Sequence, residues 1–199
     1  MIIVDGVDNT GKTTLAQELA EKYDLPLRKS TGPQKDNPEI VKEFIYSTLE
    51  RDLQDEVIYD RHALITEKVY GPVLRGKNVL EEIEDSYYLL YMFKQTRPLI
   101  IYTVLPAEEI KATFEERDQL EGVYENVDEL YRRFNKLAGQ LRSAGFQVIK
   151  YNYKGDDKDK LMEVVEEYLL QGEVARIMRR YKNGQLNYSD IRGMTDGKH

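Results

Sequence analysis

Eight residues near the start of the chain, Gly6 to Thr13, read Gly-Val-Asp-Asn-Thr-Gly-Lys-Thr and match the pattern G-x-x-x-x-G-K-[ST]. The two glycines allow backbone dihedral angles that other residues avoid, so successive N–H groups can converge on a phosphate. The apolar run Met1 to Val4 before the loop predicts a buried strand. Leu15, Leu19 and Tyr23 after it share one helical face. Strand, loop and helix in this order predict a P-loop in an α/β protein.

The residues of this loop have expected roles in binding a nucleoside triphosphate. Lys12 places a positive charge near the β and γ phosphates, and the Thr13 hydroxyl is suited to bind Mg²⁺. ATP and Mg²⁺ are therefore the expected co-substrate and cofactor. The residues expected to contact the ATP phosphates are Gly6, Asn9, Thr10, Gly11, Lys12, Thr13 and Thr14.

Apolar runs alternate with helical patterns along the rest of the chain. Strands are predicted at 1–4, 25–29, 56–60, 99–104 and 146–151, and helices at 38–49, 79–95, from Pro106, at 127–141 and at 161–169. This alternation predicts a P-loop NTPase three-layer sandwich, with a five-stranded parallel sheet and helices on both faces. Ligands of such sheets bind at the carboxyl ends of the strands, so functional residues are expected there.

Composition limits the compartment and the partners. The chain has 199 residues and no cysteine, which excludes disulfides and thiolate metal sites and fits a reducing compartment. No apolar run approaches the roughly 20 residues of a membrane span. We therefore expect a cytoplasmic protein without a membrane partner. The net charge of −7 disfavours a broad nucleic-acid surface and leaves open a local basic site for a small anionic substrate.

The third predicted strand ends at Asp60, and Arg61 and His62 follow it. A carboxylate at this position of a P-loop protein orients Mg²⁺ and its water, although a strand-end aspartate can also simply cap a turn. A hydrolytic ATPase would often carry a glutamate after this aspartate to activate water, whereas Arg61 suits a second phosphate. The pair favours phosphoryl transfer over hydrolysis. His62 is either a hydrogen-bonding residue at the strand end or an acid–base group.

A GTPase would need an Asn-Lys-x-Asp motif to read guanine. The nearest stretch is Asn135-Lys136-Leu137-Ala138, which lacks the aspartate and lies inside a predicted helix. The sequence therefore argues against a GTPase.

A lid is expected at about residues 112–126, because the polar stretch Phe114 to Gly122 follows the fourth strand and its helix and ends in glycine. An arginine on a closing lid supplies positive charge to phosphoryl transfer once water is excluded. Arg117 is the first candidate, with Arg132 and Arg133 as alternatives. The competing interpretation is a solvated helix end with ion pairs along it.

Together these motifs resemble the thymidylate kinase family, the P-loop kinases of deoxynucleoside monophosphates. The resemblance covers residues 1 to about 170 in the right order. It is carried by Asp5-Gly6-Val7-Asp8 with Gly11-Lys12-Thr13-Thr14, by Asp60-Arg61-His62 in place of Asp-Arg-Tyr, by Tyr70-Gly71 near the Tyr-Gln-Gly position, and by Arg117-Asp118 with Glu121 as a lid.

The resemblance implies roles for residues around a second, acceptor nucleotide. Asp8 is expected to contact the 3′-hydroxyl of its sugar, Arg61 to bind its phosphate, and Arg117 to bridge donor and acceptor phosphates. With Lys12 and Asp60, these two arginines form the expected catalytic set, and Thr13 and Asp60 the expected Mg²⁺ ligands. Aromatic rings that suit stacking on the acceptor base belong to Phe44 and Tyr70.

The departures from the family pattern cluster around the acceptor. Arg28-Lys29-Ser30-Thr31-Gly32-Pro33 stands where the family has Arg-Glu-Pro-Gly-Gly, and Arg28 remains a candidate for the acceptor phosphate. Asn9 replaces a glycine and His62 a tyrosine. The identity of the acceptor base therefore stays open between thymine alone, a modified pyrimidine and a broader range of bases.

The sequence thus predicts a kinase that transfers the γ-phosphoryl group of ATP to a deoxynucleoside monophosphate, within a domain of residues 1–171. The alternatives are a deoxynucleoside or polynucleotide acceptor, and a non-catalytic nucleotide-binding module. Residues 172–199 lie outside the resemblance and carry six basic and three acidic residues. They are interpreted as a basic helix and frayed tail, with a homodimer contact or a nucleic-acid tether as alternatives.

Overall fold

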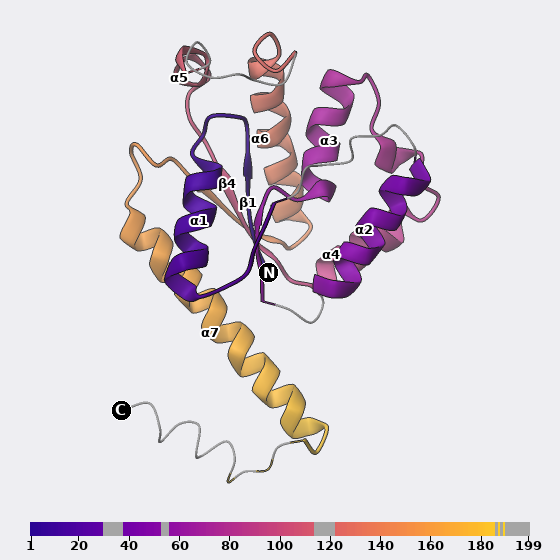
Figure 1. Ribbon diagram of the computed structural model, residues 1–199, viewed down its shortest axis with the longest axis vertical. Coiled ribbons are helices and arrows are strands. Elements are labelled where there is room, and N and C mark those ends of the chain that lie inside the picture. Colours follow the sequence, from indigo (N-terminus) through magenta and orange to yellow (C-terminus); the bar gives the residue numbers. More distant parts are fainter. Residues whose placement is uncertain (30–37, 53–55, 114–121, 186, 188, 190–199) are drawn as a thin grey trace. The chain divides into compact units, whose positions relative to one another are not determined.

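Figure 1 shows the computed structural model, which describes residues 1–29, 38–52, 56–113, 122–185, 187 and 189. By its contacts the chain divides into two units, Met1–Asp156 and Asp157–His199. The first unit is built on a five-stranded parallel sheet with the order β2-β3-β1-β4-β5. All five predicted strands are confirmed, as β1 Ile2–Gly6, β2 Leu27–Lys29, β3 Ile58–Asp60, β4 Leu99–Thr103 and β5 Gln147–Tyr151.

The order of the strands determines where a ligand can bind. From the central β1 the chain builds β2 and β3 on one side, and then β4 and β5 on the other. Val4 of β1 lies in register with Asp60 of β3 and with Ile101 of β4, so these strands reach the same edge of the sheet. A parallel α/β sheet binds its ligands where the strand order reverses, and the P-loop follows β1 at this point.

Helices cover both faces of the sheet, as the sequence predicted (Figure 1). Helix α1, Lys12–Tyr23, packs against β1 and β3 on one side. On the other side α3, Ala63–Leu74, packs against α6, Val127–Ser143. Beyond α3, helix α2, Pro38–Asp52, contacts α4, Ser86–Gln95, while the short α5, Ala107–Ala112, contacts α6.

Aromatic side chains join α6 to the functional edge of the sheet. The ring of Phe134 on α6 stacks on Tyr102 of β4, with ring centroids 5.4 Å apart. Its edge meets the ring of Tyr70 on α3 at 5.9 Å. Aromatic pairs of this kind contribute about 0.5–1.5 kcal/mol beyond the area that they bury. Tyr70 is therefore held in place by the core on one side of its ring.

The prediction of one helix over residues 79–95 is wrong. The structure has a 3₁₀ turn, η1 at Val79–Glu81, and α4 begins only at Ser86. The Asn78 side chain accepts a hydrogen bond from Leu80 N at 3.1 Å and so starts a separate short turn. Helix α3 was not predicted. It contains Pro72 in its last turn and closes with a hydrogen bond from Arg75 N to the carbonyl oxygen of Gly71 at 2.9 Å.

The second unit contains α7, Lys158–Lys182. The Asp157 side chain accepts a hydrogen bond from Asp159 N at 3.0 Å and caps this helix. The helix continues across residue 171, and both the division at that residue and the role of 172–199 remain predictions. Nothing among the described helices has the length and apolar character needed to span a bilayer.

Candidate active site

The P-loop has the backbone that its glycines predict. Gly6 and Gly11 have φ angles of 151° and 80°. A Cβ atom on Gly6 would lie 2.4 Å from the carbonyl oxygen of Thr103, so no side chain fits there. Asn9 has a φ of 60°, a left-handed conformation that asparagine tolerates better than most residues. This explains how Asn9 can stand where the resembled family has a glycine.

Lys12 is folded back over the loop. Its ammonium group donates a hydrogen bond to the carbonyl oxygen of Val7 at 2.5 Å, and the residue is buried. Burial, followed by the positive charge of Arg61, lowers the pKa of Lys12 to about 7. A phosphate beside this amine would oppose both effects and favour its charged form.

Thr13 and Asp60 meet at the same edge of the sheet. The Thr13 hydroxyl donates a hydrogen bond to Oδ2 of Asp60 at 2.8 Å. The other carboxylate oxygen, Oδ1, is buried and has no hydrogen-bond partner in the described part of the chain. Mg²⁺ in phosphoryl-transfer sites is bound by one or two carboxylates together with substrate phosphates and water. The pair Thr13 and Asp60 fits such an ion, and no denser cluster of metal-binding side chains occurs among the described residues.

Asp8, Arg61 and Tyr70 form a cluster beside the loop. The carboxylate of Asp8 forms an ion pair with the Arg61 guanidinium and accepts a hydrogen bond from the Tyr70 hydroxyl at 3.0 Å. The guanidinium lies 5.3 Å from the centroid of the Tyr70 ring. The side chains of Asp8 and Arg61 keep 16% and 22% of their surface exposed, so the cluster is open to a ligand. Residues from the P-loop, the end of β3 and α3 thus converge on one point.

Arg61 reaches this point because its own backbone is in the left-handed conformation. Arg61 has a φ of 70°, and its backbone N–H donates to the carbonyl oxygen of Val4 at 2.9 Å. A non-glycine residue in this region of φ costs of order 1 kcal/mol or more and persists only when its surroundings hold it there. As a result, Asp60 points at Thr13 while the next residue points at Asp8.

Asp5 holds this turn, and the sequence analysis gave it no role. Its buried carboxylate accepts hydrogen bonds from Gly6 N at 2.8 Å, from His62 N at 3.2 Å and from the Thr66 hydroxyl at 3.3 Å. Burial raises the pKa of Asp5, although the nearby Arg61 opposes the shift. An acid at the end of an otherwise apolar strand was the available signal.

His62 is a structural residue in this arrangement. Its Nδ1 accepts a hydrogen bond from Leu64 N at 3.3 Å and caps α3, and its ring stacks on Phe93 at 5.0 Å. Burial lowers the pKa of His62 to about 3, so the ring is neutral at physiological pH. Of the two interpretations of His62, the hydrogen-bonding residue at the strand end is the one that the geometry supports.

Other predicted residues lie on neighbouring elements. Arg28 lies on β2 in register with Tyr59, one position before the level of Asp60. Phe44 is an exposed residue of α2, and no described contact links its ring to the cluster. Thr14 is exposed in the first turn of α1.

The lid arginine is not assigned by the structure. Arg117 lies outside the described residues, as does most of the predicted lid. Arg132 and Arg133 both bind Glu129 on α6, at 2.8 Å from Oε2 and 2.6 Å from Oε1 respectively, as in the competing interpretation of ion pairs along a helix. The proposed role of a lid arginine therefore stays with Arg117.

Tyr153 is a further residue beside the P-loop that the sequence analysis missed. It follows β5 and is about half exposed, and a Cβ atom on Gly11 would lie 3.0 Å from its ring. The carboxyl end of β5 reaches the same edge of the sheet as β1, which was the only available signal.

Neither a protein-family model nor a curated protein matches the sequence. Solved structures do match. The YorR protein from Bacillus subtilis, in complex with phosphorylated GDP, superposes with a TM-score of 0.65 at 18% identity over 87% of this chain and 97% of that one. Deoxyadenosine kinase from M. mycoides with bound dCTP gives 0.51 at 17% identity, over 84% and 98% of the two chains. Thymidylate kinase from Candida albicans gives 0.51 at 14% identity, over 86% and 91%.

The chain has the fold of the P-loop nucleotide kinases. The resemblance to the thymidylate kinase-like kinases is thereby confirmed at the level of the fold. At identities of 14–18% this likeness identifies neither the substrate nor the roles of single residues.

Proposed function

We propose that this P-loop protein is a kinase that transfers the γ-phosphoryl group of ATP to a deoxynucleoside monophosphate, with Mg²⁺ as cofactor. The favoured acceptor is dTMP or a related pyrimidine nucleotide. The observation that carries the proposal is the cluster of Asp8, Arg61 and Tyr70 beside the loop. A carboxylate inside an anion-binding loop repels the phosphates of ATP and does not help to bind them. A carboxylate beside an arginine can instead accept a hydrogen bond from the hydroxyl of a second nucleotide while the arginine binds its phosphate.

In the acceptor half, Arg61 would exchange its ion pair with Asp8 for the acceptor phosphate. Asp8 would then accept a hydrogen bond from the sugar 3′-hydroxyl, while the Tyr70 hydroxyl continues to hold its other oxygen. A carboxylate and a guanidinium that are already desolvated together bind such groups at a small cost of reorganisation. Phe44, and Arg28 from β2, are further candidates for acceptor contacts.

In the donor half, the backbone N–H groups of the P-loop and Lys12 would bind the β and γ phosphates. Thr13 and Asp60 would hold Mg²⁺, which when bound neutralises charge between those phosphates. Arg117 is the proposed lid arginine. Phosphoryl transfer depends mainly on positioning and charge, and these residues would supply both without an acid–base group.

The names of two similar structures, a deoxyadenosine kinase and a thymidylate kinase, support a phosphotransferase. The first of these makes a deoxynucleoside acceptor the second candidate function. The presence of an acid at Asp8 favours the monophosphate. The absence of cysteine supports a cytoplasmic location as part of the same proposal.

The decisive experiment offers ATP and Mg²⁺ with a panel of deoxynucleoside monophosphates, nucleoside monophosphates, deoxynucleosides and DNA oligonucleotides. We expect diphosphate formation from dTMP or another pyrimidine monophosphate, and none with Lys12→Ala. Transfer to a deoxynucleoside or to DNA alone would replace the proposed acceptor. The absence of transfer to every acceptor would refute the enzyme and favour a nucleotide-binding module.

The acceptor assignment has its own test. Arg61→Ala should raise the KM for the acceptor by about 10- to 100-fold, the value of one charge-assisted phosphate contact, and leave the KM for ATP within about twofold. Arg176→Ala, which removes an exposed arginine of α7, is the matched control and should change neither constant. Equal increases in both KM values would show that Arg61 does not bind the acceptor.

A further inference from the structure

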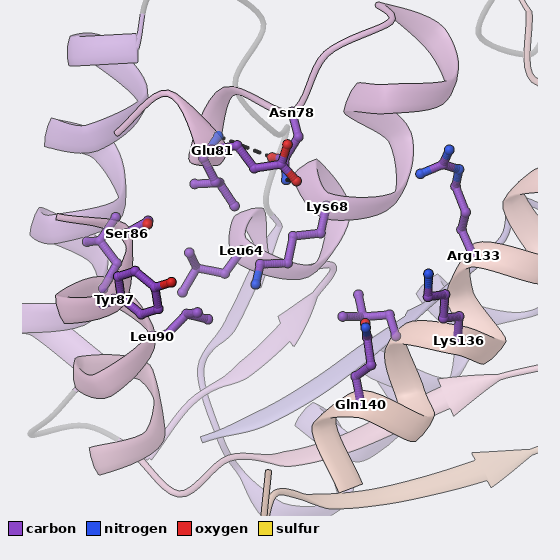
Figure 2. A pocket seen from close by; sticks show the side chains of 13 residues that line it. Leu64, Lys68, Asn78, Glu81, Ser86, Tyr87, Leu90, Arg133, Lys136 and Gln140 are labelled. Carbon is purple, nitrogen blue, oxygen red and sulfur yellow. Dashed lines mark hydrogen bonds between the residues drawn. The ribbon is translucent and has the colours of Figure 1, made fainter. Parts of the chain in front are cut away.

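A cavity lies on the first unit, and no residue of the P-loop lines it. It has a volume of about 430 Å³ and is lined by α3, η1, α4 and α6 (Figure 2). Sites for small molecules typically have volumes of about 300–1,000 Å³, so this cavity has room for one compact ligand.

Helix α3 separates this cavity from the cluster beside the P-loop. Leu64 and Lys68, one helical turn apart, line the cavity. Tyr70 lies on another face of the same helix and donates its hydroxyl to Asp8. None of the residues assigned to ATP, Mg²⁺ or the acceptor is among the lining residues. The cavity is therefore a separate site and not an extension of the proposed active site.

Two of the cations that line the cavity come from one side, and a third lies between the two sides. In Figure 2, Arg133 and Lys136 of α6 lie across the cavity from Tyr87 and Leu90 of α4, with Lys68 of α3 between them. Neither lysine makes an ion pair or a hydrogen bond with any described residue. Burial lowers the pKa of Lys68, so an anion beside its ammonium would stabilise the charged form. Arg133 is already paired with Glu129, so the two lysines carry the positive charge that favours an anionic ligand.

Only one carboxylate lines the cavity, and it is already engaged. Glu81 of η1 accepts a hydrogen bond from the Asn78 side chain at 3.1 Å. It is exposed, and its charge opposes the effect of burial on Lys68. Apart from Arg133, which is paired with Glu129, the two lysines outnumber this one acid around the cavity.

The side formed by α4 is apolar and aromatic. Leu89 and Leu90 line it, and Leu64 of α3 and Leu137 of α6 add apolar surface to the rest of the cavity. Tyr87 keeps 87% of its surface exposed, so its ring is free to cover a planar group. A ligand that fits both sides has an anionic end and a flat apolar body.

We propose that this cavity binds a small organic phosphate with an aromatic ring system, the chemistry of a nucleotide, at a site distinct from the P-loop. Lys68, Arg133 and Lys136 bind the phosphate, and Tyr87 with the leucines covers the ring. The inference goes beyond the proposed function and holds whichever acceptor the kinase uses. Because α3 also carries Tyr70, occupation of the cavity acts on the helix that completes the acceptor cluster.

The chain has no tryptophan, which allows a reporter specific to this cavity. Tyr87→Trp places a single indole at its rim, where the exposed tyrosine leaves room for the change. Its fluorescence is titrated with dTMP, dAMP, dCTP, thymidine and inorganic phosphate. We expect saturable changes with the nucleotides below about 1 mM and none with thymidine. Inorganic phosphate should compete, because the phosphate provides the charge.

Variants link the signal to the cavity. The double variant Lys68→Gln/Lys136→Gln should weaken nucleotide binding at least about tenfold, the loss of one or two charge-assisted hydrogen bonds. Glu81→Gln removes the opposing charge, keeps an acceptor oxygen for Asn78, and should tighten binding. Arg61→Ala should leave the signal unchanged. Circular dichroism establishes that each variant folds.

Three results would overturn the proposal. The first is the absence of any saturable change up to about 5 mM nucleotide. The second is a signal that does not come from the cavity. Such a signal would persist in the double lysine variant, disappear with Arg61→Ala, or appear equally with Tyr91→Trp, which places the indole at an exposed position of α4 outside the cavity lining. The third is a fluorescence change on dilution of the protein alone, which would show that a second copy of the chain covers the cavity.

Discussion

The strongest prediction concerns the proton that Lys12 takes up when ATP binds. In the ligand-free protein, burial and the charge of Arg61 lower the pKa of Lys12 to about 7. Bound phosphates stabilise the ammonium form and raise this pKa well above the working pH. One pH unit above a pKa of about 7, the amine is neutral in roughly ten molecules out of eleven. ATP binding at pH 8 should therefore take up about 0.9 proton at Lys12, and at pH 6 only about 0.1.

The sign of the effect on affinity follows directly. Because the charged form binds phosphate, the association constant for ATP should fall as the pH rises above 7, approaching tenfold per pH unit. Calorimetric titrations with a non-hydrolysable ATP analogue, without acceptor, in buffers of different ionisation enthalpy measure both quantities. Lys12→Met supplies the background from the titration of ATP itself. Arg61→Ala should move the midpoint to higher pH, because one cause of the lowered pKa is removed.

Uptake of the same number of protons by the wild-type protein at pH 6 and pH 8 would contradict this prediction. An affinity for ATP that stays constant between pH 7 and pH 9 would contradict it as well. Either result would mean that Lys12 is already charged in the free loop, and that its hydrogen bond to Val7 fully compensates its burial.

Three further substitutions test the surroundings of the site. Gly6→Ala should destabilise the protein by about 1–3 kcal/mol in urea unfolding, because its Cβ would collide with Thr103; an unchanged midpoint would contradict the loop geometry. Asp60→Asn should change the free energy of unfolding by less than about 1 kcal/mol and should raise the Mg²⁺ concentration needed for half-maximal activity about tenfold or more. An unchanged Mg²⁺ requirement would show that Asp60 is not a ligand of the ion. Glu67, a buried residue of α3, accepts a hydrogen bond from Val79 N at 3.1 Å and pairs with Arg75. Glu67→Ala should cost about 1–3 kcal/mol in the same unfolding assay, because it leaves the buried Val79 N–H without its acceptor, and a loss below about 1 kcal/mol would show that water replaces the carboxylate.

The strands and the P-loop could be predicted because their signals are local. Each buried strand is a short apolar run, and the loop depends on glycine positions that a few neighbouring residues define. The cluster of Asp8, Arg61 and Tyr70 could be expected only through the family resemblance and the rule about strand ends. The structure then brought these three side chains together from three elements.

The parts that were missed depend on distant contacts. Asp5 is identified only when the N–H of His62 and the hydroxyl of Thr66 are seen on its carboxylate. The proline inside α3 argues against a helix when only the neighbouring residues are considered. Packing of α3 against α6 nevertheless stabilises the helix. The side chains that line the cavity between α3, η1, α4 and α6 come from four elements, and no spacing along the chain links them.

The left-handed turn at Arg61 limits how the acceptor preference of such a protein can evolve. In the proposed reaction, the residue beside Mg²⁺ and the residue on the acceptor phosphate are joined by one peptide bond, with Cα atoms about 3.8 Å apart. The spacing of the two ligands at this point is then set by covalent geometry and does not depend on how the helices pack. A new acceptor preference would have to arise on α2, α3 or the lid, because any insertion between Asp60 and Arg61 would separate the two halves of the reaction.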